Sequence, residues 1–289
     1  MDTDKCRVLL NVLETGNFSK TAQQLGYTPS GVSRMMNALE EETGFKLLYR
    51  SKYGIHATPQ CESLLPIIRE LAHWSDQYYE TAEALLGLKR GHLTIGVSNP
   101  FDYSWLTPIF REFHEEYPDV KMRFIEDKST NLYHALNEYR ADLCIVSKRS
   151  FDTPFKTLKR EEMVAWIPTS HPLAKKKSIT LDVFEEETYI STFGDEDTDN
   201  TLIFKNEGIT PNMKFSTSGS YSTWCLVEAG LGISMEGENV ASQWSGHVVI
   251  RPLSPRRYVD VGVIFHDKSY QSPATQKFLE FIEDYQSEE

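Results

Sequence analysis

The chain has 289 residues, of which 40% are hydrophobic and 12% aromatic, and its formal net charge is −12 at pH 7. This length and composition suit two or three domains with hydrophobic cores and exclude a disordered chain. No apolar stretch approaches the roughly 20 residues of a membrane span. The N-terminus lacks the pattern of a signal peptide, so a cytoplasmic protein is expected.

The acidic charge is distributed unevenly along the chain. Residues 1–90 hold 10 Lys and Arg against 11 Asp and Glu, whereas residues 91–289 hold 20 against 31. The net charge therefore does not exclude nucleic-acid binding by the first part, because local basic groups bind phosphates whatever the distant charge. The four cysteines lie far apart and no pair has metal-site spacing, so reduced thiols are expected.

Residues 3–15 predict an amphipathic helix that ends at Gly16, and the stretch that follows is the most informative in the chain. Residues 18–37 predict two short helices joined by a tight turn. Ala22 is small enough for two helices to cross beside it, and Gly26 permits a sharp turn with positive φ. Either a helix-turn-helix or an ordinary helical hairpin would show this pattern.

The second of these helices has the features of a helix that reads DNA. Thr28 is a candidate N-cap, and Pro29 suits the first helical position. Val32, Met35 and Met36 recur at the spacing of a buried helix face. Together with the turn glycine, these features favour a helix-turn-helix whose second helix enters the major groove.

A small β-hairpin, or wing, is predicted beside these helices. The second helix is expected to run to Glu42 and to stop at Gly44. Residues 45–49 and 55–57 then predict two short strands, joined by a turn over residues 51–54.

A long helix is predicted next, because Thr58 and Pro59 repeat the pattern of a cap followed by a proline. It runs to about residue 88, and Pro66 is expected to kink it or to weaken its first turns. Its apolar stripe consists of Leu64, Ile68, Leu71, Trp74, Tyr78, Leu85 and Leu86. The same helix of a second subunit is expected to cover this stripe, with packing on the chain's own body as the alternative.

From residue 91 onward, strands alternate with helices. The first set comprises strands at 92–98, 120–127 and 141–147 with helices at 105–117 and 132–140. The second set comprises strands at 163–168, 188–192, 213–218, 231–235 and 259–265, helices near 201–206 and 222–229, and a last helix at 274–285. This alternation predicts a parallel sheet with crossover helices, arranged as two α/β subdomains with a cleft between them.

Three stretches of the sequence carry a resemblance to a known family: LLNVLETGNFSKTAQQLGYTPSGVSRMMNALEEETGFKLLYRSKYGIHATP, EEMVAWIPTSHPLAKKKSITL and LVEAGLGISM. They resemble the LysR-type transcriptional regulators, in the family's order and over essentially the whole chain. The resemblance implies an α/β protein with an N-terminal winged helix-turn-helix, a long linker helix and a two-subdomain effector region like a periplasmic binding protein. It also implies a homodimer or homotetramer that binds double-stranded promoter DNA and a small-molecule effector.

The resemblance further implies a division of the chain. Residues 1–58 would form the winged helix-turn-helix DNA-binding domain, residues 59–90 the dimerising linker helix, and residues 91–289 the effector-binding domain. Within the last, subdomain I would take residues 91–160 and 268–289, and subdomain II residues 161–267. RNA polymerase is a candidate further partner, no cofactor is expected, and the protein is not expected to be an enzyme.

The DNA contacts are expected at the N-terminal end of the second helix, at the start of the first, and in the wing. They are Lys20, Thr28, Pro29, Ser30, Ser33, Arg34, Arg50 and Lys52. Arg34 is the strongest candidate base reader, because a guanidinium matches guanine O6 and N7. The hydroxyl groups can bond phosphates or base edges, and the other basic residues suit phosphates. For each basic residue a solvated surface charge is the alternative.

Short polar residues follow several of the predicted strands, where ligands of open α/β units bind. They are Ser98, Asn99, Ser129, Thr130, Ser147, Ser218 and Gly219. Their hydroxyl and N–H groups would suit a carboxylate or a similar anion, with helix capping as the alternative. The resemblance implies a binding role for Ser98, Ser129 and Thr130. Phe193 and Tyr221 are candidates for an apolar wall, or else for the core.

The acidic tract from Gly194 to Asn200 resembles the start of a calcium loop. Asn200 and Asn206, however, stand where an EF-hand requires Gly and Glu, so no metal site is expected. A solvated acidic loop is expected, or else a loop that helps to select a cationic or polar effector.

An enzyme and a solute-binding transport protein are the competing classes. Against an enzyme, the sequence has no nucleophile elbow, Walker loop, metal motif or dinucleotide fingerprint. Against a transport protein, residues 1–58 form an additional module and no export signal precedes them.

Overall fold

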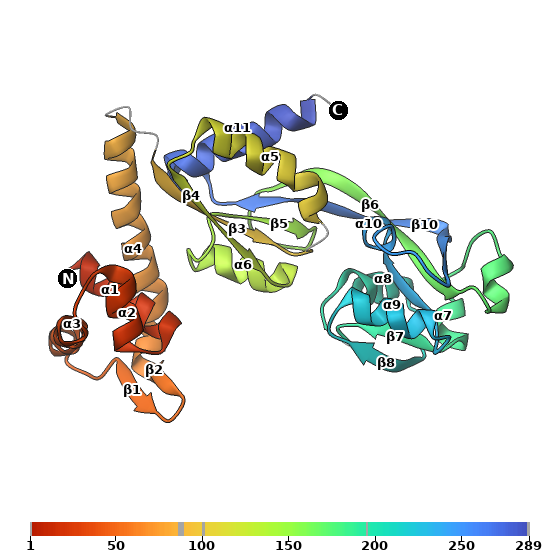
Figure 1. The fold of residues 1–289 in the computed structure, drawn as a ribbon, viewed down its shortest axis with the longest axis horizontal. Coiled ribbons are helices and arrows are strands. Elements are labelled where there is room, and N and C mark those ends of the chain that lie inside the picture. The colour runs from red at the N-terminus through yellow and green to blue at the C-terminus, as the bar shows by residue number, and fades with distance from the viewer. Residues whose placement is uncertain (1, 86–89, 100–101, 195, 288–289) are drawn as a thin grey trace.

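The computed structural model describes residues 2–85, 90–99, 102–194 and 196–287. A small helical domain with a protruding hairpin is followed by the long helix α4 (Figure 1). Two α/β units come next. The first lies beside α4, and the second lies at the other end of the molecule.

The first domain is a winged helix-turn-helix, as predicted. It comprises α1 (Thr3–Thr15), α2 (Phe18–Leu25), α3 (Pro29–Thr43), β1 (Leu48–Ser51) and β2 (Gly54–Ala57). The side chain of Thr28 accepts a hydrogen bond from the Gly31 N–H at 3.1 Å, which confirms the predicted cap of α3. Gly26 ends α2 with φ of 72°, in the left-handed region that favours glycine. Strand β1 begins later than predicted, because residues 45–47 form the connection from α3, and β2 begins one residue earlier than predicted.

The core of this domain is formed by the inner faces of its helices. It contains Val8, Leu9, Val12, Val32, Met36, Leu39 and Leu47, all of them buried. Helix α4 (Pro59–Leu85) contributes Leu65 and Ile68 to the same core. Later residues of its predicted apolar stripe, including Trp74 and Tyr78, are exposed. The first part of the stripe therefore packs on its own domain, and the later part is uncovered.

One six-stranded sheet runs through both α/β units, with the strand order β4-β3-β5-β10-β6-β9. Its strands are β3 (Gly91–Val97), β4 (Val120–Glu126), β5 (Leu143–Ser147), β6 (Phe155–Pro168), β9 (Ser234–Gly237) and β10 (Val248–Phe265). Strands β4, β3 and β5 are parallel, as predicted for the first unit. Strand β10 runs antiparallel to both of its neighbours, so the complete sheet is mixed rather than parallel.

Helices cover the sheet of the first unit on both faces. They are α5 (Tyr103–Glu116), α6 (Ser129–Asn137) and α11 (Pro273–Ser287). Helices α5 and α11 pack on one side through Phe113 and Phe278, and α6 packs on the other through Leu132 and Leu136 (Figure 1). Helix α6 begins three residues before the predicted start at Leu132.

The second unit has a small parallel sheet of β7 (Tyr189–Thr192) and β8 (Met213–Thr217). Its helices are α7 (Val183–Glu186), α8 (Asp199–Glu207), α9 (Ser220–Glu228) and α10 (Glu238–Ala241), and short 3₁₀ turns cover Pro172–Lys175 and, in the first unit, Lys268–Tyr270. Strands β6 and β10 pair with each other from one unit to the other. The end of β10, from Val261 to Phe265, pairs with β5 and thus belongs to the sheet of the first unit, ahead of residue 268.

Candidate nucleic-acid interface and ligand site

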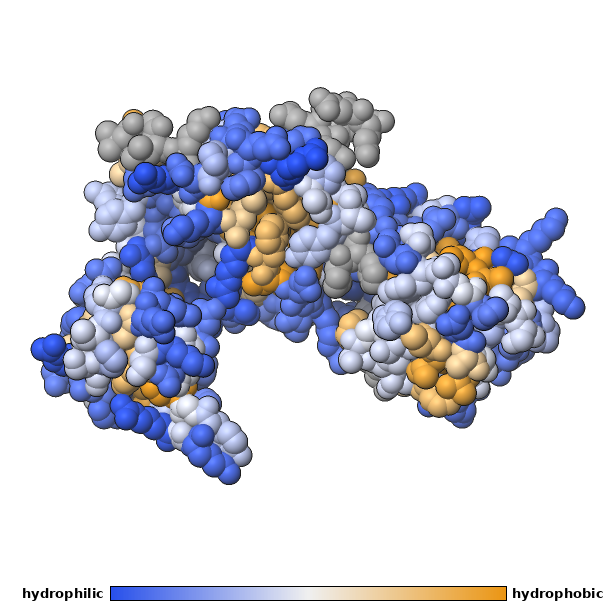
Figure 2. All heavy atoms as spheres, in the orientation of Figure 1, coloured by the Kyte–Doolittle hydropathy of each residue, from blue (hydrophilic) through white to orange (hydrophobic). Residues whose placement is uncertain are grey.

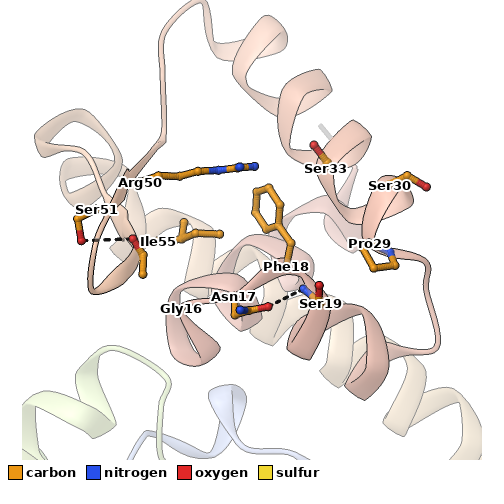
Figure 3. Close-up of a pocket in the computed structure, with 11 residues that line it drawn as sticks. Gly16, Asn17, Phe18, Ser19, Pro29, Ser30, Ser33, Arg50, Ser51 and Ile55 are labelled. Carbon is orange, nitrogen blue, oxygen red and sulfur yellow. Dashed lines mark hydrogen bonds between the residues drawn. The ribbon is translucent and has the colours of Figure 1, made fainter.

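A groove of about 530 Å³ opens on the helix-turn-helix, between the start of α2, the start of α3 and the wing (Figure 3). It is lined by Gly16, Asn17, Phe18, Ser19, Pro29, Ser30, Ser33, Arg50, Ser51, Gly54 and Ile55. Four of the predicted DNA contacts are among them, namely Pro29, Ser30, Ser33 and Arg50. Thr28, Arg34 and Lys52 are exposed on the same elements outside its lining.

Part of the positive charge of the helix-turn-helix domain is not neutralised by the acids of the described residues. Of the seven Lys and Arg in residues 1–58, three form ion pairs: Lys5 with Glu42, Arg7 with Asp4 and Asp76, and Lys46 with Glu40. The other four form none with any residue that the structure describes. They are Lys20, Arg34, Arg50 and Lys52, the four basic residues predicted to contact DNA.

The aromatic ring of Phe18 positions Arg50. The Arg50 guanidinium carbon lies 5.1 Å from the centroid of the ring, within the range of a cation–π contact. In Figure 3 the side chain of Arg50 extends from the wing toward Phe18 at the start of α2. The contact orders a long side chain that would otherwise lose conformational freedom on binding a phosphate.

The wing is fixed to α3 by Glu40, which the sequence analysis assigned no role. The Glu40 carboxylate is buried and accepts hydrogen bonds from the N–H groups of Leu47 at 2.9 Å and Leu48 at 3.2 Å. The Lys46 ammonium lies 2.5 Å from its other oxygen. Burial alone would raise the pKa of Glu40, but Lys46 and the two N–H groups together hold this pKa below its ordinary value.

Lys20 faces a different part of the surface from the other predicted DNA contacts. It lines a second groove with Asn11, Glu14, Thr15, Gln24, Leu25 and Arg123. Arg123 belongs to β4 of the first α/β unit, and its guanidinium lies 2.7 Å from the Glu14 carboxylate of α1. The second groove thus lies where the helix-turn-helix meets that unit.

The structure brings together most of the polar residues predicted at the strand ends of the first unit. The Ser147 N–H at the end of β5 donates to Ser129 Oγ at 3.2 Å, and both residues are buried. The Ser98 N–H, just after β3, donates to the Ile145 carbonyl at 2.9 Å. Asn99 follows it, and Thr130 lies beside Ser129 in the first turn of α6.

The predicted residues of the second unit are only partly joined to this group. Phe193 lies near it, because the Lys128 ammonium is 5.6 Å from the centroid of the Phe193 ring. Gly219 precedes α9, and the exposed ring of Tyr221 packs on Trp244 at 5.7 Å. None of the hydrogen bonds between described residues joins Ser218, Gly219 or Tyr221 to the polar group of the first unit.

The acidic tract is only in part the solvated loop that was expected: Glu196 and Asp197 are exposed, but their carboxylates and that of Asp199 bind the first unit. Asp197 accepts a hydrogen bond from Thr130 Oγ1 at 2.7 Å. Asp199 accepts from Ser147 Oγ at 2.8 Å and from Arg149 at 2.7 Å. Glu196 forms an ion pair with Lys128. Two cations far away in the sequence thus offset part of the charge of this tract, and two hydroxyl groups donate hydrogen bonds to it.

Two family models match the chain. The model described as "LysR substrate binding domain" matches residues 86–287, and the model described as "Bacterial regulatory helix-turn-helix protein, lysR family" matches residues 3–62. The chain belongs to the LysR family. It is therefore a DNA-binding transcriptional regulator with an effector-binding domain, as the sequence predicted, and its family is one of regulators rather than enzymes.

Curated relatives extend over nearly the whole LysR-type chain. It is 26% identical over 287 residues to the HTH-type transcriptional regulator YvbU of Bacillus subtilis, covering 98% of both chains. It is 28% identical over 274 residues to the transcriptional activator protein LysR of Escherichia coli, covering 93% of this chain and 83% of that protein.

Solved structures share the fold at lower identity. A full-length OxyR variant from Pseudomonas aeruginosa matches with a TM-score of 0.76 and 19% identity, covering 98% of this chain and 97% of the other. Full-length CbnR complexed with its target DNA matches with a TM-score of 0.68 and 19% identity, covering 98% and 99%. The helix-turn-helix, the linker helix and the two α/β units therefore occur in the same order in both.

Two buried carboxyl groups of this LysR-type regulator lie near the junction of its α/β units. Burial, together with the charge of Asp199, raises the pKa of Glu236 to about 7, against the opposing effect of the hydrogen bond from Thr192. Burial likewise raises the pKa of Asp102 to about 6, although Trp105 donates a hydrogen bond to it at 3.0 Å. Asp102 Oδ2 has no hydrogen-bond partner among the described residues.

Among the described residues, no group of His, Cys, Asp and Glu could hold a metal ion. No described helix is both long and apolar enough to cross a membrane.

Asn17 and Phe18 also line the groove, and only Asn17 carries a sequence signal for this position. Asn17 caps α2, with its side chain accepting from the N–H groups of Ser19 and Lys20. This cap stands at the edge of the groove, where the N–H groups at the start of a helix attract anions. Phe18 carries no such signal, because only the folded wing brings Arg50 over its ring.

Proposed function

We propose that this LysR-type regulator binds operator DNA through the groove of its helix-turn-helix. The recognition helix α3 presents Thr28, Pro29, Ser30, Ser33 and Arg34, while Lys20, Arg50 and Lys52 contact phosphates. The observation that carries the proposal is the unneutralised charge of these four basic side chains, in a domain whose other basic residues are paired. The wing is also hydrophilic on its visible face (Figure 2). The similar fold of CbnR with its target DNA supports the same mode of binding.

The effector site is proposed at the junction of the two α/β units. Its residues are Ser98, Asn99, Ser129, Thr130, Ser147, Phe193, Ser218, Gly219 and Tyr221, and its ligand is a small molecule with a carboxylate or similar anion.

The protein acts in the cytoplasm and contacts RNA polymerase at the promoter. The proposed domains are the DNA-binding domain (residues 1–58), the linker helix (59–90) and the effector-binding domain (91–289). The chain re-enters subdomain I within β10, where Val261–Phe265 pair with β5.

The active form is proposed to be a homodimer that pairs into a homotetramer. The support is the uncovered apolar part of α4. It comprises Ile67, Leu71, Trp74, Tyr78 and Leu85, which are 37–83% exposed. A contiguous apolar face of this kind on one helix is typical of an interface between subunits.

Replacing Arg34 with alanine is expected to weaken operator binding by about 1–3 kcal/mol, because a guanidinium that reads guanine supplies that much discrimination. Lys20→Ala should instead lower affinity equally on all sequences and reduce the salt slope by about 1. Fluorescence anisotropy titrations on the DNA upstream of the gene, and on a scrambled duplex, distinguish the two effects.

The control for these titrations is Lys277→Ala, which removes an exposed lysine from α11. It should leave both affinities unchanged. A wild-type protein without preference for the upstream DNA over the scrambled duplex would overturn the proposed function. Unchanged binding by Arg34→Ala would remove only the assignment of that residue.

Replacing both Tyr78 and Leu85 with aspartate is expected to raise the dissociation constant of the dimer by about 30-fold or more, because each change buries a charge in an apolar interface. Sedimentation velocity over a concentration series gives the constant. Tyr53→Asp is the matched control, since Tyr53 is 80% exposed but lies in the wing. An unchanged oligomeric state in the double variant would contradict the proposed interface.

A further inference from the structure

The polar groups proposed to receive an anionic effector already hold carboxylates, and these belong to the chain itself. Asp199 accepts from Ser147 Oγ at 2.8 Å and from Arg149 Nη1 at 2.7 Å. Asp197 accepts from Thr130 Oγ1 at 2.7 Å. The donors lie at the carboxyl end of β5 and the first turn of α6. The acceptors come from the connection between β7 and α8 in the second unit.

Arg149 is the central donor of this arrangement and was not predicted from the sequence. Its side chain is 10% exposed, and its Nε is buried without a hydrogen-bond acceptor among the residues that the structure describes. Asp197 Oδ1 is 3.7 Å from that nitrogen, too far for a good hydrogen bond. A buried guanidinium N–H without an acceptor is costly, so the two aspartates satisfy Arg149 incompletely.

The donors together make an anion site rather than a set of helix caps. A guanidinium and two hydroxyls converge on the carboxylates of Asp197 and Asp199, and the Lys128 ammonium pairs with the nearby Glu196 of the same tract. Such charge-assisted hydrogen bonds are the strong ones, and the fork of Arg149 suits a planar carboxylate. The neutral amide of asparagine could not replace these interactions at equal strength.

We propose that Lys128, Thr130, Ser147 and Arg149 form a binding site for a small dicarboxylate, which Asp197 and Asp199 occupy as internal ligands until an effector displaces them. The inference rests on the proposed function, since it assigns the chemical class of the effector and the residues that it contacts. An incoming dicarboxylate replaces both aspartates and gives Arg149 Nε the acceptor that it lacks.

The internal ligands also set the affinity of the site. Because the aspartates are tethered beside the donors, an effector competes with a high effective concentration of carboxylate. Its apparent affinity is the intrinsic affinity multiplied by the fraction of molecules in which the aspartates have left the site. Removing the two charges should therefore raise the affinity for a free dicarboxylate.

The test compares full-length wild type with the double variant Asp197→Asn and Asp199→Asn, with succinate as the probe at constant ionic strength. Isothermal titration calorimetry should show succinate binding about tenfold tighter in the double variant. Adding Arg149→Gln to the double variant should abolish that gain. Asp182→Asn is the matched control, because it removes an exposed carboxylate elsewhere in the second unit.

Succinate affinity in the double variant that is equal to or weaker than that of wild type would overturn the inference. So would tighter binding of 1,4-diaminobutane by wild type than by the double variant, since the acidic tract would then select a cation. The single variant Asp197→Asn should give an intermediate gain and serves if the double variant is misfolded. Titrations with operator DNA distinguish a failure of this inference from a failure of the proposed function. If the double variant and wild type bind succinate equally but the wild type still prefers operator DNA, only this inference is refuted.

Discussion

Replacing Glu40 with alanine is expected to lower the free energy of unfolding of the DNA-binding domain by about 3 kcal/mol. The change leaves the buried N–H of Leu47 and the half-buried N–H of Leu48 without an acceptor. It also removes the ion pair with Lys46, whose ammonium is largely exposed and contributes little. Urea unfolding of the full chain, followed by hydrogen exchange of the N–H groups of β1 and β2, measures the loss.

The same variant should bind operator DNA more weakly, because Arg50 is carried by the strand that Glu40 holds in place. Glu40→Gln keeps an acceptor oxygen and should lose less than half as much stability. Glu41→Ala, at the exposed neighbouring position, is the control and should change stability by less than about 0.5 kcal/mol. Equal stabilities of Glu40→Ala and Glu41→Ala would contradict the role given to Glu40.

The helix-turn-helix could be predicted because its signals are local. Thr28 caps α3, and Gly26 and Gly44 end helices in the left-handed conformation, as their positions in the sequence indicate. Glu40 was missed because it starts a run of three acids, which is usually a solvated surface. Its spacing carried the missing information, since Glu40 follows the buried Met36 by four residues and lies on the same helix face.

The long strands of the effector region were only partly predictable. Strand β6 begins at Phe155 and β10 at Val248, whereas the apolar pattern indicated strands only at 163–168 and 259–265. The additional parts are half exposed and carry charged side chains, so their local pattern resembles that of a loop. They are strands because each pairs with the other across about ninety residues of sequence, which periodicity does not reveal.

At the proposed ligand site, the sequence indicated the polar residues at the strand ends but not the aspartates that bind them. Ser129, Thr130 and Ser147 follow apolar strands, so their position could be inferred. The contacts of Asp197 and Asp199 join residues that are 50–67 positions apart. An acidic tract gives no local indication of which distant cation it will meet, and Arg149 had no motif to distinguish it.

Helix α6 and the turn that follows it join the proposed ligand site to helix α4. Thr130 lies in its first turn and binds Asp197. Just past its other end, the Glu138 carboxylate lies 2.8 Å from the Arg69 guanidinium of α4, and Tyr139 stacks on His73 of α4 at 4.4 Å. A ligand that replaces the aspartates would therefore act on an element whose opposite end touches the helix that carries the DNA-binding domain.

Replacing Glu236 with glutamine is expected to stabilise the protein above pH 7 and to leave its stability unchanged near pH 4. The Glu236 carboxyl is buried, and no basic side chain among the described residues pairs with it. Burial raises its pKa from 4.5 to about 7. Between these two pKa values the folded state keeps a proton that the unfolded state has lost. The free energy of unfolding of wild type therefore falls as pH rises from 4.5 to 7, and above pH 7 the loss of stability stays constant.

Glutamine retains an oxygen that can accept from Thr192 Oγ1 and carries no charge to bury. At pH 8 the variant should therefore be more stable than wild type by about 3 kcal/mol, from the size of the pKa difference. Free energies of unfolding from urea titrations at pH 4, 6 and 8 give the dependence. Glu238→Gln, an exposed neighbour, should follow the wild-type curve at every pH. A Glu236→Gln curve parallel to that of wild type would mean that Glu236 titrates near its ordinary pKa and that the junction solvates its charge.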